Sequence, residues 1–186
     1  MSRRGETTKV SERTTKKGIV RSLVRRGSRS DQRPPVVKRE AGLHESTLCL
    51  RCGAVYLRKT WRWAGRQFDV EHTGSSEGVC PACHQVRERE YFGRVLMRGP
   101  FLAEHEVLIR HRIENVARRA RYTQPERRVI DIVRHADGLE VLTTSQKLAH
   151  RIVREMLKSF HGQATYSWSD RNGALFATWS RPDVME

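Results

Sequence analysis

The residues best suited to chemistry in this sequence are its four cysteines, which fall into two short pairs. Cys49 and Cys52 form one C-x-x-C motif, Cys80 and Cys83 form the other, and 27 residues separate the two motifs. Each motif presents two sulfurs from one tight turn, and Gly53 permits the positive φ that such a turn often needs. Four thiolates satisfy the tetrahedral coordination of Zn²⁺. We therefore predict that these cysteines bind one zinc ion in a zinc ribbon, with each pair on its own hairpin.

Disulfides and iron are the alternatives for these cysteines. Disulfides need an oxidising compartment, and no signal peptide precedes the motifs. A rubredoxin-like iron site would use the same two turns, but it would leave the basic N-terminal segment without a purpose. His72 or His84 could replace one cysteine, although we expect both histidines to face solvent or to lie beside the ligands. Because four thiolates leave no open coordination position, we expect a structural metal.

No arrangement of residues in the sequence is typical of an enzyme. The acidic residues are scattered, and there is no H-x-x-x-H, G-x-S-x-G or phosphate-loop motif. His105 is expected to pack and His111 to face solvent, and neither has the neighbours of a catalytic histidine. We predict a non-catalytic protein with no small-molecule substrate.

The balance of charge indicates a polyanionic partner. The 186 residues contain 36 Lys and Arg against 21 Asp and Glu, a formal net charge of +15. For a soluble protein the usual polyanion is nucleic acid. No stretch approaches the roughly 18 apolar residues that span a bilayer. We therefore expect a cytoplasmic protein that is neither embedded in a membrane nor secreted.

The positive charge is concentrated at the N-terminus. Residues 1–43 carry 13 Lys or Arg and four acidic residues, and their few apolar residues follow no amphipathic period. Such a segment cannot bury enough surface to offset its ordering entropy, so we predict a disordered basic tail. A merely solubilising tail is one interpretation. We favour a tail that wraps a phosphate backbone, with these candidate contacts: Arg3, Arg4, Lys16, Lys17, Arg25 and Arg26.

Aromatic and basic residues alternate between the cysteine pairs. Trp61 and Trp63 flank Arg62 with the period of a β-strand. Rings interleaved with arginines suit base stacking, but a zinc ribbon has a small core, so we expect the tryptophans to pack over the metal hairpins. The candidate phosphate contacts in this segment are the cations Arg58, Lys59, Arg62 and Arg66.

A zinc ribbon over residues 44–98 is predicted to be followed by a second domain over 99–186. Apolar residues recur at helical spacing over 101–121 and again from Leu148 to Phe160. On the second helix, four cations fall within about 60° of one another opposite the apolar face. This stripe is a further nucleic-acid candidate, although helices commonly keep cations on their solvated face: Lys147, Arg151, Arg154 and Lys158.

Two hairpins complete the predicted second domain. Strand patterns over 129–133 and 139–143 flank Asp137-Gly138, and a second pair of strands turns at Asn172-Gly173. The order helix–hairpin–helix–hairpin predicts a small antiparallel sheet with two helices on one face. The expected fold class is therefore α+β.

These motifs, in this order, resemble an uncharacterised family of short bacterial zinc-ribbon proteins over about residues 45–181. The shared segments are Cys49-Leu-Arg-Cys-Gly-Ala-Val-Tyr, Trp61-Arg-Trp, Cys80-Pro-Ala-Cys-His, Gly99-Pro-Phe, Pro125-Glu-Arg, Thr143-Thr144 before Lys147-Leu-Ala, and Trp179-Ser-Arg. The resemblance implies a fold and a metal. The family is distantly similar to the zinc-bearing part of the nonsense-mediated-decay-three-type adaptor that escorts the large ribosomal subunit, which implies ribosome or rRNA binding. The metal pairs of that adaptor are spaced differently.

The favoured hypothesis is a non-catalytic, ribosome-associated protein that binds structured RNA through its tail and exposed arginines. RNA is preferred over DNA because no recognition-helix motif is present. A DNA-binding transcriptional regulator is one alternative, and it would make base-specific contacts to duplex DNA. A protein-interaction module that docks through its sheet is another, and it would need an exposed apolar patch.

Overall fold

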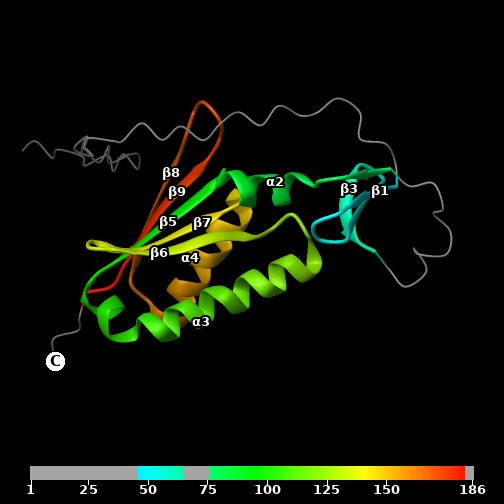
Figure 1. The fold of residues 1–186 in the computed structure, drawn as a ribbon. Coiled ribbons are helices and arrows are strands. Elements are labelled where there is room, and N and C mark those ends of the chain that lie inside the picture. The colour runs from blue at the N-terminus through cyan, green and yellow to red at the C-terminus, as the bar shows by residue number, and fades with distance from the viewer. Residues whose placement is uncertain (1–45, 65–75, 183–186) are drawn as a thin grey trace, which may run out of the picture. The chain divides into compact units, whose positions relative to one another are not determined.

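The computed structural model describes residues 46–64 and 76–182, all of which belong to one compact unit of the chain (Figure 1). The predicted basic tail over residues 1–43 lies outside the described residues. So do several residues singled out in the sequence: Arg3, Arg4, Lys16, Lys17, Arg25, Arg26, Arg66 and His72.

A small four-stranded sheet carries the first cysteine pair at the end of one strand and in the turn that follows it. Its strands are β1 (Thr47–Cys49), β2 (Ala54–Leu57), β3 (Thr60–Trp63) and β4 (Glu77–Gly78), in the order β3-β2-β1-β4. The β1–β2 and β2–β3 pairs are antiparallel, whereas β4 runs parallel to β1. Arg58 and Lys59 both have positive φ between β2 and β3. Positive φ at both central residues is the geometry of a two-residue hairpin turn whose twist matches its strands.

The second cysteine pair lies at the start of a helix rather than on the predicted second hairpin. Helix α2 (Pro81–Glu88) follows β4 directly, with Cys80 as its N-cap. The Cys80 sulfur accepts the backbone N–H of Cys83, and Pro81 occupies the first turn, where its missing N–H costs nothing. The sequence Cys-Pro-Ala-Cys therefore begins a helix here. The prediction that the second cysteine pair lies on a hairpin of its own is wrong.

A five-stranded sheet forms the larger part of the structure. Its strands are β5 (Gly93–Arg98), β6 (Val129–His135), β7 (Gly138–Thr143), β8 (Gln163–Trp168) and β9 (Leu175–Ser180). Their order is β6-β7-β5-β9-β8, so β5 is the central strand.

Strand β5 shows that two predictions from the sequence, the antiparallel sheet and the domain boundary at residue 98, were wrong. It pairs antiparallel with β7 but parallel with β9, so the sheet is mixed and not antiparallel. Residues 93–98 were expected in the zinc ribbon, yet they join the two predicted hairpins into one sheet. Val95 and Met97 are fully buried, while Arg94 and Arg98 are exposed on the other face. That alternation is what a strand with one buried face requires.

Two helices, α3 (Pro100–Thr123) and α4 (Gln146–Phe160), cover one face of this sheet (Figure 1). The core between the layers is apolar, and its largest fully buried side chains include Trp179, Met97 and Met156. Gly93 allows α4 to approach the sheet closely, because a Cβ atom there would lie 2.5 Å from the Cβ of Ala149. The predicted α+β class is confirmed. Among the described residues, neither helix nor any other has the length and apolarity that a membrane span demands.

Candidate metal centre and basic surfaces

The four cysteines converge although they come from different elements. Cys49 ends β1, Cys52 lies in the turn before β2, and Cys80 and Cys83 lie at the start of α2. All four sulfurs lie within 4.8 Å of one another. Gly53 closes the first turn with φ +72°, and its N–H donates to the Cys49 carbonyl at 2.8 Å.

The spacing of the sulfurs fits a tetrahedral metal ion. The Cys49 and Cys83 sulfurs are 3.8 Å apart, and those of Cys52 and Cys80 are 3.7 Å apart. A metal–sulfur bond of about 2.3 Å gives a tetrahedron whose edges are about 3.8 Å. A disulfide needs about 2.05 Å between its sulfurs, and all four cysteines are free. The cluster could therefore hold a metal ion.

The charges of the cluster also favour a bound cation. Burial raises the pKa of the Cys80 thiol, and the negative charges of the other three cysteines raise it further. Burial also raises the pKa of Cys83. Burial opposes ionisation of Cys49 as well, but N–H groups of Cys80, Arg51 and Cys52 outweigh it and lower the pKa of Cys49 to about 7. Burial and like charges thus oppose the ionisation of Cys80 most strongly, and a divalent cation at the centre of the cluster would stabilise the thiolates.

Arg128 lies against the cluster and was not anticipated from the sequence. Its Nη1 donates to the Cys83 sulfur at 3.1 Å, and its Nη2 lies 3.7 Å from the Cys80 sulfur. Its Nε donates to the Pro125 carbonyl at 2.7 Å, and its backbone N–H donates to Thr144 Oγ1 at 2.9 Å. The guanidinium therefore offsets thiolate charge and links the cysteines to the five-stranded sheet. No sequence motif marks Arg128, because 44 residues separate it from Cys83.

Three of the four cysteines are buried, Cys52 is partly exposed, and the cluster has a small core of its own. Cys49 is 1% exposed, Cys80 is fully buried, and Trp61 packs beside them with 4% of its surface exposed. His84 lies outside the sulfur cluster, 3.8 Å from Glu90, with 43% of its side chain exposed. Trp63 differs from Trp61, because it is 36% exposed and its Nε1 donates to the carbonyl of Arg121 on α3 at 2.8 Å.

The basic candidates on α4 share one exposed face. All four are exposed, and no ion pair between described residues includes any of them: Lys147, Arg151, Arg154 and Lys158. The described candidates near the cysteines, Arg58, Lys59 and Arg62, are also exposed, at the β2–β3 hairpin.

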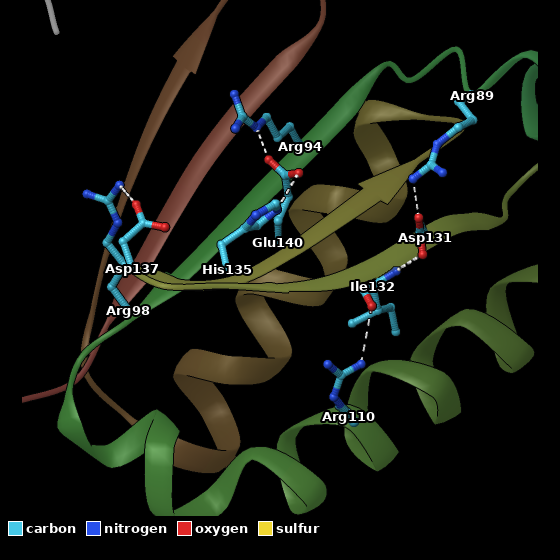
Figure 2. A network of polar contacts seen from close by, with 9 residues as sticks. All are labelled: Arg89, Arg94, Arg98, Arg110, Asp131, Ile132, His135, Asp137 and Glu140. Carbon is cyan, nitrogen blue, oxygen red and sulfur yellow. Dashed lines mark hydrogen bonds and ion pairs between the residues drawn. The ribbon is translucent and has the colours of Figure 1, made fainter.

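The arginines on the open face of the five-stranded sheet are neutralised instead (Figure 2). Arg94 pairs with Glu140, whose other oxygen contacts His135 at 3.2 Å. Arg98 pairs with Asp137 at 2.6 Å. Among the described residues, carboxylates thus pair with these sheet arginines but with none of the four cations on α4.

We predict that Cys52→Ser abolishes metal binding and the order of β1–β4 and α2 but leaves the five-stranded sheet folded. Three remaining thiolates bind a metal more weakly, and the small cluster around Trp61 has little apolar surface of its own. Metal content and ¹H–¹⁵N NMR spectra of the parent and the variant test this. Dispersed signals from β1–β3 in a metal-free Cys52→Ser protein would contradict it.

We also predict that Arg128→Met lowers metal affinity by roughly 10- to 100-fold, because a group that hydrogen-bonds to the ligands tunes them. Competition with a chromogenic chelator measures this affinity. The matched control is Arg127→Met, which removes the neighbouring charge without touching a sulfur, and its affinity should equal that of the parent. Equal affinities for all three proteins would show that Arg128 does not support the metal.

Comparison with known protein families and with curated proteins finds no match for this chain. The resemblances drawn from its motifs therefore stay predictions, and the proposals below depend on the contacts and charges of its own residues.

Proposed function

We propose that this protein is a non-catalytic, zinc-dependent RNA-binding protein whose main phosphate-binding surface is the exposed face of α4. The observation that carries the proposal is the set of four cations on that face, for which no ion pair is found among the described residues. We call this set the α4 stripe: Lys147, Arg151, Arg154 and Lys158.

The like charges of the α4 stripe repel one another in the folded chain, which supports a functional reason for the stripe. Like charges four residues apart on a helix destabilise it by about 0.2–0.5 kcal/mol per pair. The only acidic residue of α4 is Glu155, and Arg112 of α3 lies 3.4 Å from its carboxylate. A polyanion would neutralise the stripe. From first to last the stripe rises about 16 Å, which matches about five nucleotides at 3.4 Å per nucleotide.

Aromatic rings flank the α4 stripe. Trp168 is 57% exposed, and its ring stacks on that of Tyr166 with the centroids 6.2 Å apart. Tyr166 lies 5.3 Å from the ring of His150 on α4. Cations beside exposed rings suit a strand whose phosphates and unpaired bases are both accessible. Folded RNA displays such bases in loops and bulges, so we propose RNA rather than duplex DNA as the ligand.

We propose zinc as the metal and a structural role for it. Iron fits the same sulfur distances, but the proposed function needs no electron transfer, and zinc has no redox chemistry. Four thiolates would leave no open position for a substrate, which supports a non-catalytic assignment. The metal would hold the β2–β3 hairpin in place, so that Arg58, Lys59 and Arg62 form a second group of phosphate contacts.

Neutralising the α4 stripe should lower RNA affinity by roughly 100-fold at low salt and make the salt dependence about 3 units shallower in log–log slope. The variant is K147Q/R151Q/R154Q/K158Q, and fluorescence anisotropy with a stem–loop RNA measures its affinity. The matched control, R87Q/R89Q/R98Q/R134Q, removes the same net charge from arginines that have carboxylate partners away from α4. Equal losses in both variants would show that only net charge matters and would contradict a specific surface.

We further propose that ribosomal RNA is the partner and that residues 1–43 extend the contact. The parent should co-sediment with purified ribosomal subunits at low salt and dissociate at high salt. Deleting residues 1–43, which carry a net charge of +9, should weaken that association roughly tenfold or more at low salt. Unchanged association of the truncated chain would assign the tail to solubility.

A further inference from the structure

A wide groove lies between Trp63 of β3 and the C-terminal half of α3. Its volume is about 1040 Å³, at the upper end of the roughly 300–1,000 Å³ range of small-molecule sites. Apolar, aromatic and basic side chains line it, and no carboxylate is among the described residues of its lining. We call it the Trp63 groove: Trp63, Val86, Ala117, Arg118, Arg121, Tyr122, Arg128 and Val129.

We propose that the Trp63 groove binds an unpaired nucleobase of the RNA together with its flanking phosphates. This inference rests on the proposed function and deepens it, because it adds a site for unpaired bases to the phosphate contacts of the α4 stripe.

The two rings of the groove are available for stacking. Tyr122 is 82% exposed and Trp63 is 36% exposed, whereas Trp61, two residues earlier on the same strand, is buried. Trp63 is held in place, because its Nε1 donates to the Arg121 carbonyl and the Arg121 guanidinium lies 5.5 Å from its ring centroid. An exposed ring that is already fixed loses little entropy when a base stacks on it.

The charges of the groove suit phosphates rather than a neutral or basic ligand. Arg118 bonds to the side-chain oxygen of Asn115, a neutral group, and Arg121 contacts Trp63. Neither arginine has an ion pair with a described carboxylate. Both are exposed, so both can reach a backbone that passes the groove while a base enters it.

The groove also depends on the metal centre. Arg128 lines it and donates to the Cys83 sulfur, and β3 belongs to the same small sheet as Cys49. Metal binding would therefore fix two sides of the groove before RNA arrives.

The test compares a single-stranded 12-nucleotide RNA with an RNA duplex of the same length, both by fluorescence anisotropy on the zinc-loaded full chain. Trp63→Ala and Tyr122→Ala should each weaken single-strand binding roughly tenfold and leave duplex binding unchanged, because only unpaired bases can stack. Trp63→Phe, which keeps a ring, should recover most of the single-strand affinity. Leu108→Ala is the matched control, since Leu108 is 54% exposed on α3 but does not line the groove.

The outcomes separate this proposal from the one it rests on. Single-strand affinities of Trp63→Ala and Tyr122→Ala equal to that of the parent would overturn the groove as a base site. Equal losses for single strand and duplex would overturn it as well. If the proposed function holds, the α4 stripe variant would still bind RNA more weakly than the parent in either of these outcomes. A parent protein that binds neither RNA would overturn both proposals. Tyr122→Ala guards against misfolding of Trp63→Ala, because the exposed Tyr122 ring contributes little to packing.

Discussion

Four cysteine sulfurs lie within 4.8 Å of one another, and the hydrophobic cluster around them is small. Besides the cysteines, the cluster consists of two alanines, Trp61 and the partly buried Tyr56. Such a core offers too little apolar surface to offset the entropy of ordering four short strands. The sulfurs also repel one another once they ionise, and a bound cation would stabilise them. We therefore expect the order of β1–β4 and α2 to depend on a bound metal ion.

Two contacts connect the candidate metal centre and its sheet to the rest of the structure. Arg128 connects the sulfurs to β6 and to Thr144, and Trp63 connects β3 to the end of α3. The five-stranded sheet has its own apolar core, so we expect it to fold without the metal. A rigid basic helix on one part and a metal-organised hairpin on the other would let the chain hold an RNA strand at two separate places. We propose that RNA binding uses both of these surfaces.

Local patterns in the sequence were enough to predict the cysteine cluster, the α+β class and the amphipathic character of α4. Each of these depends on residues that lie close together or on a strict periodicity. The start of α2 was missed, although Cys80 followed by Pro81 is a recognisable helix N-terminus. Strand β5 was missed too, although Val95 and Met97 alternate with Arg94 and Arg98.

Other features could not be predicted, because they depend on pairing across long stretches of chain. The parallel pairing of β5 with β9 joins Gly93 to Leu175, and nothing local specifies it. The bond from Arg128 to Cys83 and the assembly of the Trp63 groove depend on the same tertiary arrangement. Residue types alone also gave no means of separating the paired arginines of the sheet from the α4 cations, which form no ion pair with the described residues. Only the positions of the carboxylates make that distinction.

X-ray absorption at the metal edge of the purified protein tests the structural zinc site most directly. We predict one zinc ion per chain, with four sulfur neighbours at about 2.3 Å and no nitrogen or oxygen in the first coordination sphere. A zinc ion with an oxygen or nitrogen neighbour would contradict it, since an open or histidine-bound site would require a different ligand set. A redox-active iron in place of zinc would equally contradict the structural role that we assign to the metal.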